Sequence, residues 1–217
     1  EDIKEVVKVL KSDWLTQGPK NEEFEKAVTD YCGAKYGVAV CSGTAGLQAA
    51  YMAAGIKSGD EVITTPLTFA ATANALVYLG AKPVFADIQE DTLNIDPGEI
   101  RKKITNKTRS LAPVDFAGHP CDYDEILEIA KKNNLLVIED ACHALGSQYK
   151  GRKIGSLAHM TVLSFHPVKH ITTGEGGMIL TNNKDFYEKL KIIRHHGIIK
   201  KPEKGLWYYE IEEPGLN

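Results

Sequence analysis

The chain has 217 residues, 25% of them charged and 43% hydrophobic, which is typical of a soluble globular protein with one large domain or two small ones. With a net charge of −3, no basic cluster, no signal sequence and no long apolar run, the sequence favours neither a nucleic-acid partner nor a membrane. The four cysteines show no CxxC spacing, which argues against a disulfide framework or a metal site and favours reduced thiols in a cytoplasmic protein.

The N-terminal region is expected to contain two helices. Residues 2–11 repeat apolar side chains at the spacing of an amphipathic helix, and turn residues follow at 12–19. Asn21 is expected to cap a second helix that runs to Tyr31, because asparagine is a favoured cap and acidic side chains follow in the first turn. Gly33 is expected to end this helix.

From Tyr36 onwards, short apolar runs alternate with helical patterns. We expect strands at 38–40, 61–65, 83–88, 110–115 and 135–140, separated by helices at 45–54, 70–79, 97–104 and 123–133. This alternation predicts an α/β fold with a mostly parallel sheet and helices on both faces. Beyond Ala141 the sequence predicts strands at 147–153, 160–165 and 177–181, then a helix at 184–196 that Gly197 ends. No element is predicted for 198–217.

Lys169 lies on the connection between the last two predicted strands, among glycines and hydroxyl side chains. A lysine held between apolar strands loses its proton more easily, and a neutral amine attacks a carbonyl carbon whereas an ammonium does not. This stretch alone is equally consistent with a solvated surface lysine. The interpretation therefore depends on the chemistry found elsewhere in the chain.

The turn Cys41–Leu47 joins a predicted strand to a predicted helix and contains small residues and hydroxyls. Small residues let the backbone approach an anion, and the start of a helix offers free N–H groups, so a phosphate would suit this turn. The pattern is neither the lysine-bearing P-loop nor the GxGxxG of dinucleotide-binding folds. A glycine-rich turn with a purely structural role is the alternative.

Two further strand ends carry candidate ligand-binding side chains. Asp140 ends an apolar strand, where its carboxylate would face the crevice of an α/β sheet and could hold a cationic ring nitrogen. His143 follows within reach of a neighbouring ring hydroxyl, and Phe69 at another strand end offers a surface on which a flat ligand could stack. The alternatives are a solvated carboxylate, a half-buried histidine and a core phenylalanine.

An amine that can form a Schiff base, a phosphate cradle, an acid for a pyridinium nitrogen and an aromatic plate together match the requirements of pyridoxal 5′-phosphate (PLP). The motifs Ser42–Leu47, Val137–Gly146 and Ser164–Gly177 resemble those of the DegT/StrS family of sugar-nucleotide aminotransferases. The resemblance implies a fold type I architecture, with residues 1–217 as a large PLP-binding domain built on a seven-stranded, mostly parallel sheet. Residues 1–34 would form its N-terminal helices and substrate loop.

The resemblance also implies a role for each matching residue around the cofactor. Lys169 would form the Schiff base and then move a proton, and Asp140 would face the pyridine nitrogen. His143 would lie near the ring hydroxyl, at a position where the family often has glutamine. The phosphate-binding and ring-stacking residues implied are Thr44, Ala45, Ser164 and Phe69.

The implied substrates are glutamate and a nucleotide-linked 4-keto-6-deoxyhexose, contacted by Thr16 and His166. Asn217 matches an asparagine that reaches the cofactor phosphate of the neighbouring subunit, which implies a homodimer with shared active sites. Phe165–Gly174 and Val114–Gly118 look most like the branch that aminates UDP-linked sugars for pseudaminic acid.

The ends of the chain depart from the family pattern, and two alternative functions are considered. The chain opens at Glu1 without methionine and stops at Asn217, before the small C-terminal domain of the family, which we interpret as a fragment or an incomplete chain. An inactive PLP-fold module retained for dimerisation or regulation is therefore the main alternative, although the intact Lys169 and Asp140 argue against it. An NAD-dependent oxidoreductase on a similar sheet is disfavoured because no GxGxxG follows an early strand.

Overall fold

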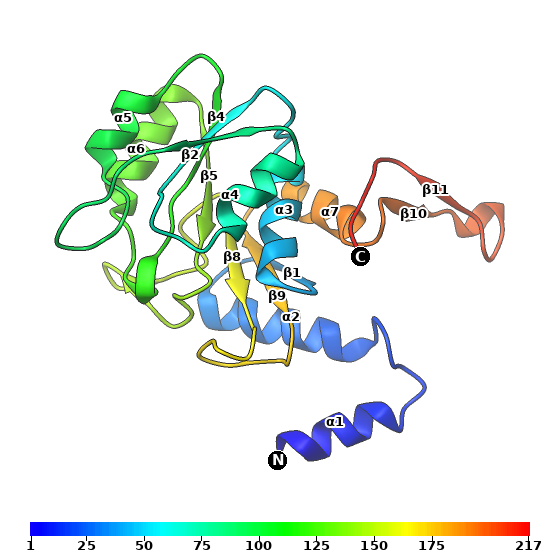
Figure 1. Cartoon of the computed structure of the whole chain (residues 1–217). Coiled ribbons are helices and arrows are strands. Elements are labelled where there is room, and N and C mark those ends of the chain that lie inside the picture. The colour runs from blue at the N-terminus through cyan, green and yellow to red at the C-terminus, as the bar shows by residue number, and fades with distance from the viewer.

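The computed structural model describes residues 1–217 and is organised around a seven-stranded sheet (Figure 1). The strand order is β1-β9-β8-β5-β4-β2-β3, and β9 is the only strand that runs against the others. The strand bounds are β1 (Tyr36–Val40), β2 (Glu61–Thr64), β3 (Lys82–Phe85), β4 (Thr108–Ala112), β5 (Leu136–Asp140), β8 (Met160–Ser164) and β9 (Gly177–Thr181). The mostly parallel sheet that the alternating pattern predicted is confirmed.

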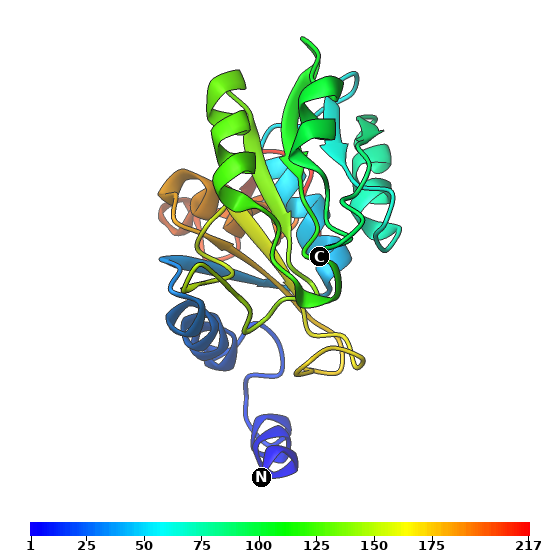
Figure 2. The ribbon, with the colours of Figure 1, turned by 90° about the vertical axis from the view of Figure 1, so that its left-hand side faces the viewer.

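Helices cover both faces of this sheet and enclose a separate apolar core on each side. One face is covered by α2 (Pro19–Cys32), α5 (Pro97–Lys103) and α6 (Tyr123–Asn133), and Figure 2 shows the last two side by side. The other face is covered by α3 (Gly43–Ala53), α4 (Ala71–Tyr78) and α7 (Lys184–Ile193). Strands covered on both faces need apolar side chains in both directions, which explains their continuous hydrophobic runs.

Several expected element bounds are wrong. The strands expected at 83–88 and 110–115 end at Phe85 and Ala112, and three other expectations fail for clear physical reasons. The second helix begins at Pro19 after Gly18, not at an Asn21 cap, because proline lacks the N–H that the first turn leaves unpaired and its fixed φ suits that position. Residues 147–153 form a two-stranded hairpin, β6 (Gln148–Tyr149) and β7 (Arg152–Lys153), instead of one strand, since the chain reverses at Lys150 and Gly151 with positive φ.

The third concerns the last long helix. It ends at Ile193, three residues before the expected end, because His196 and Gly197 both adopt positive φ and reverse the chain. The final residues then return to this point, where the Leu216 N–H donates to the Ile193 carbonyl at 2.6 Å. Between them lie β10 (Ile198–Lys200), the 3-10 turn η2 (Pro202–Lys204) and β11 (Tyr209–Ile211), for which the sequence predicted no element. A second 3-10 turn, η1, spans Phe116–Gly118.

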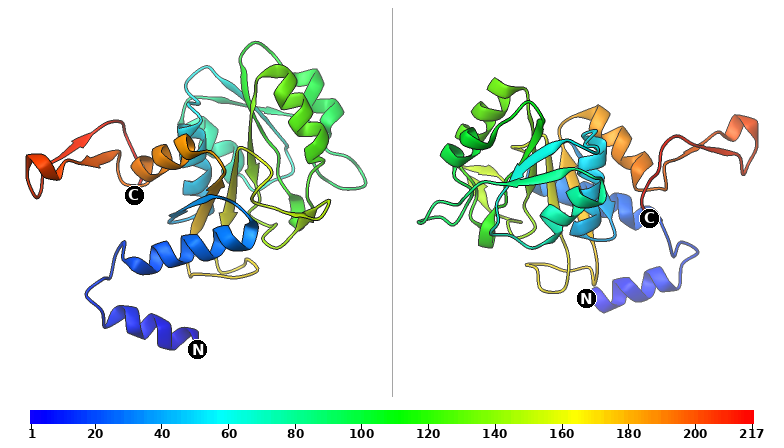
Figure 3. Two further views of the ribbon diagram at one scale, coloured as in Figure 1. Left: turned by 180° about the vertical axis from the view of Figure 1, so that it is seen from behind. Right: turned by 45° about the horizontal axis from the view of Figure 1, so that its top comes forward.

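Two elements project from the body of the molecule. Helix α1 (Asp2–Leu10) has no buried residue, and it and the β10–β11 hairpin stand clear of the sheet from front and back (Figure 1, Figure 3). Both carry large apolar side chains in solvent, among them Ile3 at 80% exposure and Trp207 at 88%. No helix is long and apolar enough to cross a membrane.

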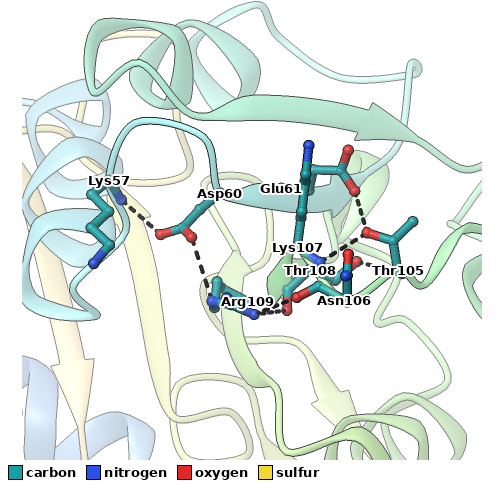
Figure 4. A network of polar contacts seen from close by, with 8 residues as sticks. All are labelled: Lys57, Asp60, Glu61, Thr105, Asn106, Lys107, Thr108 and Arg109. Atoms are coloured by element: carbon teal, nitrogen blue, oxygen red, sulfur yellow. Dashed lines mark hydrogen bonds and ion pairs between the residues drawn. The ribbon is translucent and has the colours of Figure 1, made fainter.

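Polar contacts tie together the amino ends of β2 and β4 (Figure 4). The Asp60 carboxylate accepts from the Lys57 amide at 3.1 Å and pairs with Arg109 at 3.4 Å. The Thr105 hydroxyl donates to Glu61 at 2.6 Å and is the main reason that the pKa of Glu61 is lowered. These local pairs satisfy the buried Asp60 and Glu61 at the amino edge of the sheet, and the open cleft lies at the opposite, carboxyl edge.

Candidate active site

A cavity of about 670 Å³ opens at the carboxyl ends of the strands, where an α/β sheet binds its ligands. Five segments far apart in the sequence contribute to it: the turn after β1, the loop after β2, the segment after β4, the end of β5 and the β8–β9 connection. The sequence-predicted residues that line it are Thr44, Phe69, Asp140, His143, Ser164, His166 and Lys169.

One end of the cleft is the amino terminus of α3. Ser42 caps this helix, and its hydroxyl oxygen accepts a hydrogen bond from the Ala45 amide at 3.1 Å. The amides of Gly43 and Thr44 have no hydrogen-bond partner within the protein and remain open to a ligand. A Cβ on Gly43 would lie 3.0 Å from both Cys142 Sγ and Ser164 Cβ, so only glycine leaves room for a ligand to approach these amides. Unpaired amides at the positive end of a helix form an anion site.

The opposite wall carries Asp140, the last residue of the fully buried end of β5. Its side chain is only 5% exposed. The carboxylate accepts hydrogen bonds from the Thr72 hydroxyl at 2.7 Å and from the Cys142 amide at 3.2 Å. A nearly buried carboxylate with two donors is fixed in orientation, which a partner for a ring nitrogen requires.

Lys169 lies half-buried on the β8–β9 connection, and its amide donates to the His166 carbonyl at 2.9 Å. The buried Phe165 ring anchors the start of this connection by packing edge-on against Phe24 at 4.9 Å between centroids. Further along, two donors reach the Phe165 carbonyl oxygen: the Thr173 amide at 3.1 Å and the Thr172 hydroxyl at 2.9 Å. The lysine therefore sits on a loop that is held closed at its base.

Burial and neighbouring charges shift the pKa values of two side chains in the cleft. Burial lowers the pKa of His143, and the positive charge of Lys169 lowers it further, so this imidazole is neutral at neutral pH. Burial and the negative charge of Asp140 raise the pKa of the Cys142 thiol, which keeps its proton. A neutral histidine beside a cation and a carboxylate can donate or accept one hydrogen bond without adding charge.

Phe69 stands in the loop after β2 and is 75% exposed. The alternative that this ring is a core residue is therefore wrong, because its face is open to a ligand. His166 is also exposed, and its Nε2 lies 3.9 Å from a carboxylate oxygen of Glu175, which lines the same cleft.

Three sequence-predicted residues do not line the cleft. The amide of Ala45 is already bonded to Ser42, as described above. Thr16 lies between α1 and α2, in a separate hollow of about 430 Å³. Asn217 is beside the turn after β1, where its carbonyl oxygen lies 3.4 Å from Cys41 Sγ, but it is exposed and outside the cavity. Their roles remain predictions.

Sequence reasoning missed two threonines near Asp140. Thr72 holds the Asp140 carboxylate, and Thr68 lines the cleft with its hydroxyl 2.9 Å from that of Thr72. The available signal was the pair of hydroxyl residues four apart at the start of a predicted helix, which puts both on one face. Nothing local in the sequence indicates that this face meets Asp140, 68 residues further along.

The sequence matches one protein family over residues 1–217, the whole length of the chain. The chain belongs to the DegT/DnrJ/EryC1/StrS aminotransferase family. A family member from Campylobacter jejuni, UDP-4-amino-4,6-dideoxy-N-acetyl-beta-L-altrosamine transaminase, is 47% identical over 219 residues, covering 100% of this chain and 57% of that protein.

Solved structures of this family share the fold. Helicobacter pylori PseC, an aminotransferase of pseudaminic acid biosynthesis, superimposes with a TM-score of 0.94 at 39% identity, over 99% of this chain and 57% of that one. The PLP form of the sugar aminotransferase Spr1654 from Streptococcus pneumoniae gives a TM-score of 0.92 at 34% identity, over 99% and 59%. The chain thus spans less than two thirds of these family members, and its sheet is that of fold type I aminotransferases.

Proposed function

We propose that this protein is a PLP-dependent aminotransferase that moves an amino group from glutamate to a nucleotide-linked 4-keto-6-deoxyhexose. The observation that carries the proposal is that the Lys169 side chain, the Asp140 carboxylate and the open amides at the start of α3 line a single cleft. Residues 1–217 would be the large cofactor-binding domain, with residues 1–34 as its N-terminal helices and substrate loop.

The residues present fit the cofactor at each of its functional groups. The amides of Gly43 and Thr44 suit a phosphate dianion, and Ser164, whose side chain faces Gly43, would add a hydroxyl donor. The fixed carboxylate of Asp140 suits a protonated ring nitrogen, and the exposed Phe69 face suits the ring. Bound there, the cofactor would supply an electron sink for negative charge at the α-carbon of the amino donor.

Three side chains of the cleft would then take part in the reaction. The Lys169 amine would hold the cofactor aldehyde and, once displaced, carry a proton at the reacting carbon as general acid and base. Asp140 would keep the ring nitrogen protonated, because a buried carboxylate stabilises a nearby cation. Neutral His143 would hydrogen-bond the ring hydroxyl without competing for that charge.

The substrate and the location of the protein follow as part of the same proposal. The Campylobacter jejuni relative is a transaminase of a UDP-linked 4-amino sugar, which supports a UDP-linked substrate for surface polysaccharide or glycan biosynthesis. His166 at the mouth of the cleft and Thr16 in the N-terminal loop would contact it. A cytoplasmic location is supported by four cysteines that are all unpaired.

A homodimer with shared active sites is supported by the two projecting elements. Leu10 on α1 is 66% exposed, and Leu206 and Trp207 on the hairpin are 90% and 88% exposed. Apolar surface of this extent is typical of an interface, and a second copy of the chain would cover it. Asn217 would then reach the cofactor phosphate of the neighbouring subunit.

Borohydride reduction of the full-length protein with PLP, followed by peptide mapping, tests the proposal. The label is expected on Lys169 and should be lost in Lys169→Ala but kept in the control Lys189→Ala, whose exposed side chain lies outside the cleft. Added glutamate should convert the absorbance of the bound cofactor to that of the pyridoxamine form. Label on another lysine would refute the assignment of Lys169, and binding without conversion by glutamate would favour a regulatory or dimerisation module.

A further inference from the structure

The hydroxyl of Thr72 occupies a central position beside Asp140. Thr72 is fully buried near the start of α4. Its Oγ1 lies 2.7 Å from Asp140 Oδ2, 2.9 Å from Thr68 Oγ1 and 3.3 Å from the Phe69 carbonyl oxygen. These neighbours belong to the segment that carries the exposed Phe69 ring and to the end of β5.

The number of protons on these atoms fixes the direction of the hydrogen bonds. A hydroxyl donates one proton and accepts through its lone pairs, whereas an ionised carboxylate only accepts. The Thr72 proton therefore goes to Asp140, at the shorter distance and with the stronger, charge-assisted acceptor. Thr72 must then accept from Thr68, which gives a chain that runs from Thr68 through Thr72 to Asp140.

The backbone of Thr72 is anchored as well. The hydroxyl of Tyr51, a fully buried residue of α3, donates to the Thr72 carbonyl at 3.3 Å. Burial raises the pKa of Tyr51 well above its usual value, with the charge of Asp140 adding to it, so this hydroxyl stays a donor. Helix α3 thus holds the residue that orients Asp140, and the same helix presents its open amides to the cleft.

We propose that Thr72 is a positioning residue of this site: its hydroxyl fixes the orientation of the Asp140 carboxylate, and Thr68 couples that carboxylate to the loop that carries Phe69. The inference rests on the proposed function only where it assigns Asp140 to the ring nitrogen. Without the Thr72 hydroxyl, Asp140 Oδ2 has no donor and only the Cys142 amide still holds the carboxylate, so its orientation is no longer fixed at both oxygens.

Three variants separate this role from simple packing. Thr72→Val keeps the shape and removes the hydroxyl, whereas Thr72→Ser keeps the hydroxyl and removes a methyl. Thr64→Val is the matched control, because Thr64 is equally buried and its hydroxyl donates at 2.8 Å to a backbone carbonyl, that of Ala112, instead of to the site. A packing role predicts similar effects for Thr72→Val and Thr64→Val.

The first measurement needs no cofactor. Crystal structures of the three apoproteins should show the Asp140 carboxylate rotated away from its native orientation in Thr72→Val and unchanged in Thr72→Ser and Thr64→Val. An Asp140 carboxylate that keeps its orientation in Thr72→Val would overturn the proposal. This arm decides the positioning role even where the protein binds no PLP.

The second measurement is the affinity of the full-length apoprotein for PLP, followed by fluorescence. Losing a hydrogen bond to a charged group should weaken binding by about tenfold or more in Thr72→Val, while Thr72→Ser and Thr64→Val stay within about threefold of wild type. Thr68→Val should weaken binding less than Thr72→Val, because Thr72 keeps its own proton for Asp140. Equal affinities for wild type and Thr72→Val would refute the inference, whereas a wild type without measurable affinity would refute the proposed function instead.

Discussion

Glu139 and Asp115 form a buried acid pair whose behaviour with pH can be predicted from the structure. Both side chains are fully buried, and each has one carboxyl oxygen without a hydrogen-bond donor. The other oxygen of Asp115 accepts from the Tyr123 hydroxyl at 2.8 Å and the Cys121 amide at 2.9 Å, and Glu139 accepts from the Thr161 hydroxyl. Each of the two carboxyl groups also shifts the pKa of the other. One of them must therefore carry a proton, because two facing buried carboxylates would repel.

Glu139 is the residue that keeps this proton. Burial raises its pKa well above the usual value, and the negative charge of Asp115 raises it further. Below the ordinary glutamate pKa, both the folded and the unfolded chain bind the proton. Above it the unfolded chain releases the proton and the folded chain does not, so folding loses about 1.4 kcal/mol for each pH unit while Glu139 stays protonated.

The substitution Glu139→Gln removes this dependence. A glutamine amide can donate to Asp115 in place of the shared proton, and its carbonyl can accept from Thr161. Above the ordinary glutamate pKa, the free energy of unfolding of the variant should therefore rise relative to wild type by about 1.4 kcal/mol for each pH unit over which Glu139 stays protonated. Urea unfolding at a series of pH values measures the difference.

The control for this experiment is Glu90→Gln, because Glu90 is exposed and has no hydrogen-bond or ion-pair partner in the structure. This variant removes a glutamate charge without changing the buried pair, so it measures the effect of the Glu→Gln exchange itself. If the Glu139→Gln and wild-type curves ran parallel over this range, Glu139 would be ionised in the folded protein and the shared proton would be excluded.

Three other predictions concern the cleft and its support. Gly177→Ala should lower both thermal stability and PLP affinity, because a Cβ there would overlap the Ser42 carbonyl and displace the turn that precedes α3; differential scanning fluorimetry and cofactor titration measure this. Arg194→Met should cost about 3 kcal/mol in urea unfolding, since it leaves the nearly buried Glu25 carboxylate without its cation. The NMR titration midpoint of His143 should lie below 6.5 and move upward in Lys169→Ala, because that variant removes a nearby positive charge.

The strand–helix order and the location of the cleft could be predicted from the sequence because they depend on local patterns. Continuous apolar runs indicate strands covered on both faces, and ligand-binding side chains gather where such strands end. Asp140 and the turn after β1 each follow a run of this kind, which made them candidates beside a purely structural alternative, whereas Ser164 was named only from the family resemblance. Lys169 was a candidate from its place between two such strands, but that place was equally consistent with a surface lysine until the other candidate groups were considered with it.

Features that depend on contacts between distant segments could not be predicted in this way. The sequence shows Thr72 as one hydroxyl near the start of a helix, and only the packing of α4 beside β5 makes it the donor to Asp140. Phe69 was equally consistent with a core residue, because the sequence does not reveal that no element covers its loop. The predicted start of the second helix was wrong for a local reason. Pro19 and Asn21 both favour helix starts, and the helix begins at Pro19 because the fixed φ of proline suits the first turn.

The order of strands explains why the acid and the lysine meet. Strand β8 pairs with β5 in parallel, with Asp140 opposite Val162, so the chain leaves β8 at Ser164 only two residues beyond the level of the carboxylate. Strand β9 then returns antiparallel to β8, with Gly177 opposite Ser164, so the intervening connection must start and finish at the same edge of the sheet. The connection therefore begins and ends at the edge of the sheet where Asp140 ends β5, and Lys169 and Asp140 line the same cavity. The single reversed strand is therefore the feature of the topology that brings amine and carboxylate into one cleft.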